Sequence, residues 1–230
     1  MLTITKLSDY RDEHGNEIIH GGITDRNIRI NFRGENNTLR VSPQARIGWL
    51  HVEFDCSNAT LEIGPHGRVP PFLGWIRLGQ DAKVRIGASV STTKTCTITA
   101  LEGATVTIGD DVMLASENEI RTEDAHPIFD VRTGERINPA KDVTIGNHVW
   151  IAKRAVLLGG AAIGDGSVLG FGSLLKGRVP NNCIAAGTPA RVVRENIAWE
   201  RPHLSLTPPF YKPDASSVTK SAYWRLTSHD

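Results

Sequence analysis

Residues 145–175 read IGNHVWIAKRAVLLGGAAIGDGSVLGFGSLL, and an aliphatic residue stands at every sixth position of this stretch. The aliphatic positions are Ile145, Ile151, Leu157, Ile163, Leu169 and Leu175. Four residues after each of the first five, the side chain is small or β-branched: Val149, Ala155, Ala161, Ser167 and Ser173. A period of six drifts by about 120° per repeat around an α-helix, so no helix face stays apolar. The pattern instead predicts a triangular β-solenoid, in which three hexads make one coil and successive coils stack as parallel strands.

Upstream of this stretch the six-residue frame continues with interruptions. Ile108, Leu114 and Ile120 keep the step of six, as do Leu78, Val84, Val90 and Cys96, whereas Glu102 breaks it. Residues 28–32 and 51–54 alternate between apolar and polar side chains, which is typical of strands. We therefore expect irregular solenoid turns over residues 1–75, hexapeptide coils over 76–195 and an extended tail over 196–230. A β-sandwich, the alternative all-β fold, does not explain six aliphatic residues in frame.

One segment interrupts the six-residue period of aliphatic residues. Ile108 and Ile145 are 37 residues apart, one more than six hexads, and the residues between them include TEDAHP at 122–127 and TGER at 133–136. Clusters of Pro, Gly and charged residues are typical of loops. We therefore predict a loop that protrudes from the coil at about residues 122–142. Functional residues concentrate on loops that a rigid scaffold positions, which makes His126 a candidate.

The composition narrows the class of protein. The 230 residues carry 26 Lys and Arg against 25 Asp and Glu, a net charge of +1 that argues against nucleic-acid binding. The N-terminus lacks a signal-peptide pattern, and the weakly polar stretch 156–175 contains Asp165 and periodic apolar residues, so we expect no membrane span. Three distant cysteines indicate neither a disulfide framework nor a metal motif. We therefore expect a cytoplasmic globular protein.

With these motifs in place, the sequence resembles the hexapeptide-repeat acyltransferases of the left-handed parallel β-helix fold. The resemblance rests on the hexads, on DAHPIFD at 124–130, on IGNHVWI at 145–151 and on AGTPAR at 186–191, and it covers residues 78–197 well. The loop is most similar to that of capsular polysaccharide O-acetyltransferases, such as those acting on polysialic acid. The resemblance implies a left-handed coil, a homotrimer with active sites between neighbouring coils, acetyl-CoA as donor and a sugar hydroxyl as acceptor.

The resemblance also implies roles for individual residues. His126 would be the general base, Trp150 would line the subunit groove near the thioester, and Asp124 is a candidate to orient His126, with a solvated loop carboxylate as the alternative. Many relatives have Thr-Lys where this chain has Lys176-Gly177, which leaves the role of Lys176 open. The residues expected along the coenzyme A groove are Lys153, Phe171, Lys176, Arg191 and Arg194.

Other functions remain open at this point. Carbonic anhydrases with the same coil bind zinc through three histidines, two of them close in sequence, but no two of the eight histidines here are four or five apart. We therefore expect no metal, and we expect His148 to face outward beside Trp150. No cysteine lies in a motif for covalent catalysis, which favours direct transfer in a ternary complex. The alternatives are acetylation of a small molecule, such as a free sugar, a nucleotide sugar or an antibiotic, and a non-catalytic trimeric scaffold.

Overall fold

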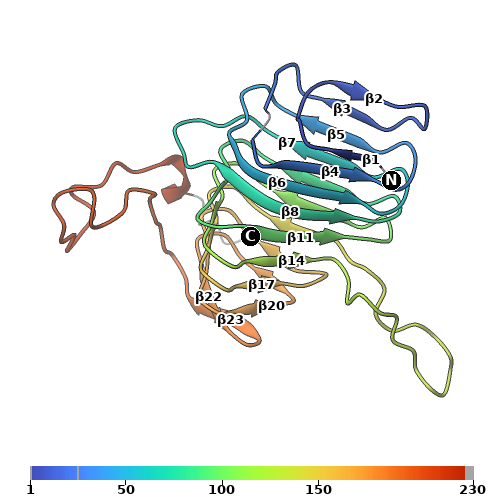
Figure 1. Ribbon diagram of the computed structural model, residues 1–230. Helices are drawn as coiled ribbons and strands as arrows, with labels where there is room; N and C mark the ends of the chain where they lie inside the picture. Colours follow the sequence, from blue (N-terminus) through green and yellow to red (C-terminus); the bar gives the residue numbers. More distant parts are fainter. Residues whose placement is uncertain (1, 25, 226–230) are drawn as a thin grey trace.

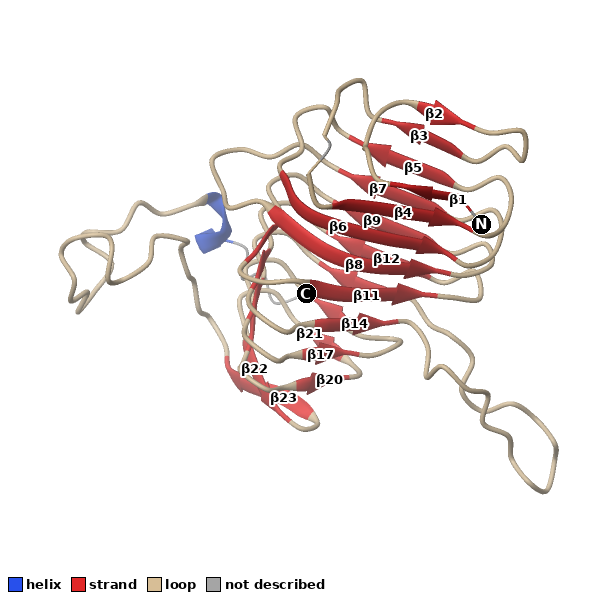
Figure 2. Ribbon diagram, in the orientation of Figure 1, coloured by secondary structure: helices blue, strands red, loops and turns tan. Residues whose placement is uncertain are grey.

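Three sheets form the sides of a triangular coil in the computed structural model, which describes residues 2–24 and 26–225 (Figures 1 and 2). Within the described chain, sheet I has the order β1 (Leu2–Ile4), β4 (Ile28–Phe32), β6 (Ile47–Phe54), β8 (Phe72–Leu78), β11 (Cys96–Ala100), β14 (Glu119–Arg121), β17 (Val156–Leu157) and β20 (Leu174–Leu175). Sheet II has the order β2 (Tyr10–Arg11), β3 (Glu17–Ile19), β5 (Thr38–Val41), β7 (Thr60–Ile63), β9 (Lys83–Ile86), β12 (Thr105–Ile108), β15 (Val143–Ile145), β18 (Ala162–Ile163) and β21 (Arg178–Val179).

Sheet III has the order β10 (Ser91–Thr92), β13 (Met113–Leu114), β16 (Trp150–Ile151), β19 (Val168–Leu169), β22 (Ile184–Gly187) and β23 (Ala190–Arg194). Successive coils pair in parallel, for example β15 with β18 and β16 with β19. Antiparallel pairs join β1 to β4, β2 to β3 and β22 to β23. A short 3-10 helix, η1 (Ala222–Arg225), lies near the end of the described residues.

The six aliphatic residues of the 145–175 stretch all lie in the interior of the coil, as the period predicted. Their side chains are at most 3% exposed, and they stack on aliphatic residues of neighbouring coils, such as Ile145 on Ile163. The small residues Ala155, Ala161, Ser167 and Ser173 are buried as well. Burial of one Leu or Ile side chain stabilises the fold by about 1.5–3 kcal/mol, so this column is a main source of stability.

The length of a coil changes at the loop. Downstream, Ile145 pairs with Ile163 and Ile151 with Leu169, a separation of three hexads. Upstream, Ile86 pairs with Ile108, and the difference of their residue numbers is 22. The upstream step of six is confirmed at Ile108, Leu114 and Ile120, which pair with the hexad residues Ile145, Ile151 and Leu157. It is wrong as a period for Leu78, Val84, Val90 and Cys96, which are all buried but do not stack at that spacing, since Cys96 pairs with Gly74. Glu102 lies outside the interior on a turn with φ 56°, which is why it breaks the frame. The division near residue 75 stays a prediction.

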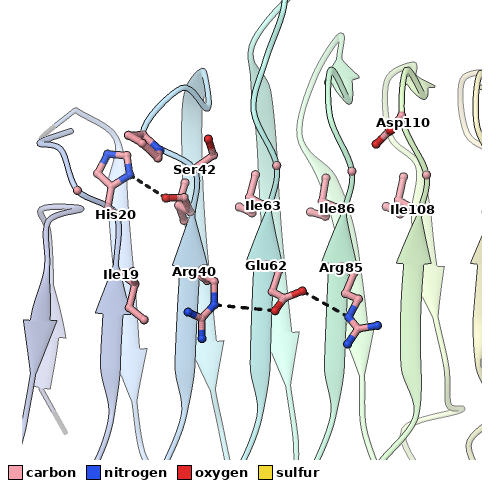
Figure 3. Close-up of a pocket in the computed structure, with 16 residues that line it drawn as sticks. Ile19, His20, Arg40, Ser42, Glu62, Ile63, Arg85, Ile86, Ile108 and Asp110 are labelled. Atoms are coloured by element: carbon pink, nitrogen blue, oxygen red, sulfur yellow. Dashed lines mark hydrogen bonds and ion pairs between the residues drawn. The ribbon is translucent and has the colours of Figure 1, made fainter.

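The glycine that follows an aliphatic residue lies at a corner where successive coils are in close backbone contact. Figure 3 shows Ile63, Ile86 and Ile108 in a row on successive coils, and each is followed by a glycine. A Cβ atom on Gly87 would lie 2.6 Å from the carbonyl oxygen of Gly109, and one on Gly109 would lie 2.7 Å from the backbone of Gly146. These distances are shorter than any ordinary contact, so the corner between sheets II and III closes only with hydrogen in place of a side chain.

Two segments leave the coil at different places (Figure 1). The first lies between β14 and β15 and is the predicted loop, since β14 ends at Arg121 and β15 begins at Val143. The second follows β23 and is the predicted extended tail, which projects from the coil and returns to it near η1. Residues 226–230, the end of the predicted tail, lie outside the described residues.

Candidate active site

His126 lies on the protruding loop, at the corner of the coil where sheet I gives way to sheet II. The loop begins directly after β14, and the amide of His126 donates to the carbonyl oxygen of Asp124 over 2.8 Å. Ala125 has φ 65°, a left-handed conformation that turns the chain immediately before the histidine. The imidazole is exposed to solvent, so a reactant can reach it from outside the coil.

A buried carboxylate anchors the start of this loop. Glu123 is 7% exposed and accepts hydrogen bonds from the Thr99 hydroxyl (3.0 Å), from the Arg121 guanidinium (3.2 Å) and from the Ala125 amide. Burial favours the neutral form of Arg121, but the carboxylates of Glu123 and Glu119 outweigh it and raise the pKa of that guanidinium. No local pattern in the sequence singles out Glu123, because its partner Thr99 lies one coil earlier.

Asp124 has a different partner from the one expected. Its carboxylate accepts from the side-chain amide of Asn138 over 3.2 Å, and among the described residues no hydrogen bond joins it to the imidazole of His126. The expected direct contact between this carboxylate and the imidazole is therefore absent from the described residues, and the two residues are joined through their backbone and through Asn138. Asn138, which also donates to the carbonyl oxygen of His126 over 2.9 Å, was not among the predicted residues.

Trp150 lies on β16 in sheet III and is 36% exposed. It lines a cleft of about 640 Å³ between this sheet and the tail, together with Met113, Trp199, Leu204 and Trp224. The rings of Trp150 and Trp199 are 6.1 Å apart and tilted by 47°. The tail thus provides an aromatic wall opposite the outward face of Trp150.

His148 faces away from the interior of the coil, as expected, but the tail covers it and leaves it only 2% exposed. It occupies a coil corner with φ 51°, and its imidazole is sandwiched between Trp199, at 4.1 Å, and Tyr223, at 4.7 Å. Nδ1 lies 2.6 Å from the Asp111 carboxylate and Nε2 lies 2.9 Å from the carbonyl oxygen of Trp199. Burial favours the neutral ring, but these hydrogen bonds, above all the one to Asp111, outweigh it and raise the pKa of His148. The tail covers this corner, which the sequence around His148 does not reveal.

The residues expected along the coenzyme A groove fall into two groups. Lys153 follows β16, with its ammonium 3.4 Å from Glu117, and Phe171 follows β19 and is 65% exposed. These two stand one above the other, since the Gly172 amide donates to the carbonyl oxygen of Lys153. Arg191 and Arg194 are exposed on β23 at the edge of sheet III. Lys176 lies apart from them.

Lys176 instead lies at the base of the loop. It follows β20, at the corner between sheets I and II, and lines a small cavity of about 60 Å³ with Asp124, Asn138 and Lys141. This position places a cation beside the start of the loop. The predicted site residues therefore gather on two parts of the coil.

These two parts face away from each other within one chain. His126, Asp124 and Lys176 belong to the corner between sheets I and II, whereas Trp150, Lys153, Phe171, Arg191 and Arg194 lie on sheet III or at its border. In a three-sided coil, the corner between two sides lies opposite the third side. The two groups of predicted site residues, called half-sites below, therefore do not meet each other within one protomer.

Residues 2–24 and 26–225 contain no group of three or more His, Cys, Asp or Glu side chains arranged to hold a metal ion. Over the same ranges, no helix has the length and apolar character that a membrane crossing requires. His229, one of the eight histidines, lies outside the described residues.

Known proteins are similar to this chain in architecture and in sequence. The pattern of the bacterial transferase hexapeptide family (six repeats) matches residues 142–177. A polysialic acid O-acetyltransferase of Neisseria meningitidis is 37% identical over 170 residues, which cover 73% of this chain and 77% of the relative. A polysialic acid O-acetyltransferase of Escherichia coli O1:K1 is 38% identical over 96 residues, which cover 42% of this chain and only 31% of the relative.

A solved structure agrees over most of the chain. The crystal structure of the polySia specific acetyltransferase NeuO superposes with a TM-score of 0.73 at 30% identity, covering 85% of this chain and 91% of the other. This likeness extends well beyond residues 142–177, which are the part that the hexapeptide pattern matches. The chain therefore belongs to the hexapeptide-repeat acyltransferases of left-handed β-helix fold, the family of the polysialic acid O-acetyltransferases to which it is similar.

Proposed function

We propose that this protein transfers an acetyl group from acetyl-CoA to a sugar hydroxyl of an acidic capsular or other cell-surface polysaccharide. The names of the two bacterial relatives, both polysialic acid O-acetyltransferases, support this acceptor class. The observation that carries the proposal is the position of His126, exposed on a loop that a buried carboxylate fixes to the coil.

The chemistry follows from the weakness of an alcohol as a nucleophile. In the proposed step the imidazole of His126 takes the hydroxyl proton while the oxygen attacks the thioester carbonyl. The new C–O ester bond forms, the C–S bond breaks, and the coenzyme A sulfur leaves as a thiolate that takes up a proton. Burial, with a smaller effect from Glu119, raises the pKa of Cys96 to about 12, which leaves that thiol inert and favours direct transfer over an acyl-enzyme.

We further propose that three copies assemble so that the loop of one protomer meets sheet III of the next. Large apolar side chains on the loop support this arrangement: Ile128 (49% exposed), Phe129 (54%), Val131 (98%) and Ile137 (63%). Trp150 and Phe171 would then border the pantetheine arm, and Lys153, Arg191 and Arg194 would meet the phosphates. Three unpaired cysteines support a cytoplasmic location for the reaction.

The decisive experiment supplies acetyl-CoA and a panel of acceptors to the purified protein and follows the products by mass spectrometry. The panel contains polysialic acid, a neutral capsular polymer, free sialic acid and a simple galactoside. We expect acetylation of the acidic polymer. His126→Ala should lower turnover by about 10²–10⁴-fold, because the reaction loses its general base.

A matched control uses another exposed histidine. His14 lies on a turn of the first coils, near Glu13 and Glu35, and His14→Ala should leave turnover unchanged. Acetylation of a monosaccharide alone would support the small-molecule alternative. Absence of both transfer and coenzyme A binding would support the scaffold alternative. Full turnover of His126→Ala would reject the assignment of the base.

A further inference from the structure

A single side-chain amide ties together the two arms of the protruding loop beside His126. The Oδ1 atom of Asn138 accepts from the amide of Ile128 over 2.7 Å. Its Nδ2 donates to the carbonyl oxygen of His126 over 2.9 Å and to the Asp124 carboxylate over 3.2 Å. Between His126 and Ile128 stands Pro127, which has no amide hydrogen to offer. Asn138 therefore supplies the hydrogen bonds that an opposing strand would supply elsewhere.

Regular pairing resumes immediately beyond this contact. The amide of Ile137 donates to the carbonyl oxygen of Ile128 over 2.9 Å, and Phe129 faces Arg136 in an antiparallel bridge. The histidine thus stands at the point where a short hairpin begins. Without the side chain of Asn138, the hairpin would still close, but the carbonyl group of His126 would lose its hydrogen bond to the returning arm.

The returning arm is itself fastened to the coil. Arg136 donates to the Glu102 carboxylate over 2.6 Å and, through a second guanidinium nitrogen, to the carbonyl oxygen of Asn138 over 3.2 Å. The Ala140 amide donates to the other oxygen of Glu102 over 3.2 Å. The bonds from Arg136 and Ala140 lower the pKa of Glu102, so that its carboxylate stays ionised. A continuous chain of hydrogen bonds therefore runs from the coil through Asn138 to His126.

We propose that Asn138 is a positioning residue that sets the direction in which His126 projects toward the neighbouring protomer. The proposal rests on the proposed function, because it assumes that His126 is the base. A proton-accepting group must stay within hydrogen-bond reach of the hydroxyl, and small misplacements of a reacting group cost about 10²-fold in rate. Asn138 does not contact the reacting atoms. Its hydrogen bonds hold the loop, and the loop in turn positions His126.

The test compares Asn138→Ala, Asn138→Asp and the loop-tip control Thr133→Ala by steady-state kinetics. Asn138→Ala should lower kcat by about 10–10²-fold with little change in the KM for acetyl-CoA, because the donor half-site lies on another face. The Thr133 hydroxyl accepts a bond from the Glu135 amide at the tip, and its variant should retain kcat. An unchanged kcat in Asn138→Ala, or a rise in KM alone, would overturn the proposal.

Asn138→Asp adds a readout that loop stability alone does not move. The ionised carboxylate that this substitution introduces would repel the carbonyl oxygen of His126, whereas the protonated carboxyl is isosteric with the amide and donates one hydrogen bond. The ratio of kcat for Asn138→Asp to kcat for Asn138→Ala should therefore rise as the pH falls, because protonation of the introduced carboxyl restores the donor to the carbonyl oxygen of His126. A ratio that does not change with pH would contradict the role of the amide donor.

Hydrogen exchange separates failure of this inference from failure of the proposed function. Exchange of the backbone amides around Ile128 should be faster in Asn138→Ala than in the parent protein, whether or not any acceptor is acetylated. A parent protein that transfers no acetyl group refutes the proposed function, while unchanged exchange in Asn138→Ala refutes the positioning contact itself.

Discussion

At the scale of single residues, glycines of successive coils pack face to face with no room for a side chain. A methyl group on Gly87 would lie 2.6 Å from the backbone of Gly109, and the backbone of a neighbouring coil cannot move aside without shifting the ladder. We predict that Gly87→Ala lowers the free energy of unfolding by about 1–3 kcal/mol through overpacking. Urea denaturation at a fixed protein concentration measures this change.

Gly177→Ala is the matched control for this prediction. Gly177 is exposed, and an added Cβ there meets none of the described atoms within 4 Å. Its substitution should leave the urea midpoint nearly unchanged. An equal loss of unfolding free energy in both variants would mean that the conformational preference of glycine, and not contact between coils, makes it necessary at the corner.

At the scale of elements, the tail is fastened to the coil by a charged histidine. Both ring nitrogens of His148 face acceptors, the Asp111 carboxylate and the carbonyl oxygen of Trp199, so the cationic ring, which carries hydrogen on both nitrogens, satisfies both contacts. Arg201 of the tail donates to the other oxygen of Asp111 over 2.5 Å. Protonation of His148 therefore strengthens an attachment of the tail that Arg201 also supports.

This dependence predicts how the tail responds to pH. The pKa of His148 is raised, so its contribution is fully present below the unfolded value of about 6.5 and is lost as pH rises through the folded value. Burial raises the pKa of Asp111, but its bonds to His148 and Arg201 lower it overall, so the carboxylate stays charged over this range. Proteolysis within residues 202–220 should accelerate as the pH rises above about 6.5.

Two variants check the source of the effect. His148→Gln cannot carry the charge, so its tail should be cleaved quickly at every pH. His203→Ala removes an exposed tail histidine whose ring hydrogen-bonds to Ser205, and it should keep the pH dependence of the parent. Equal cleavage of the parent at acidic and alkaline pH would contradict the assignment.

At the scale of the whole molecule, the two half-sites predict complementation between protomers. His126→Ala and Trp150→Ala subunits, co-expressed with different tags and purified through both, form mixed trimers in which one of three interfaces has an intact pair. These trimers should recover about one third of the parent activity. Activity no higher than that of either variant alone would place the complete site within one chain.

The sequence predicts this architecture where the spacing of aliphatic residues along the chain is regular. The step from Ile145 to Ile151 depends on neighbouring residues, and the break in the frame directly identifies the loop that carries His126. Contacts between distant segments leave no such pattern: His148 and Trp199 are 51 residues apart, and Asn138 looks like an ordinary loop residue. Longer turns were expected before residue 75, but between Leu78 and Cys96 an apolar spacing of six concealed the separation of 22 residues at which neighbouring coils stack, as Ile86 does on Ile108.

The strands that run antiparallel at the ends of the stack have a consequence for solubility. β23 folds back on β22 at the last edge of sheet III, and β1 and β2 reverse direction at the first edges of sheets I and II. Another molecule that docked there in register would meet a ladder of the wrong polarity. Growth of the coil into filaments by addition of parallel strands is thereby disfavoured at three of the six sheet edges, whereas β20, β21 and β10 keep the parallel direction at the other three.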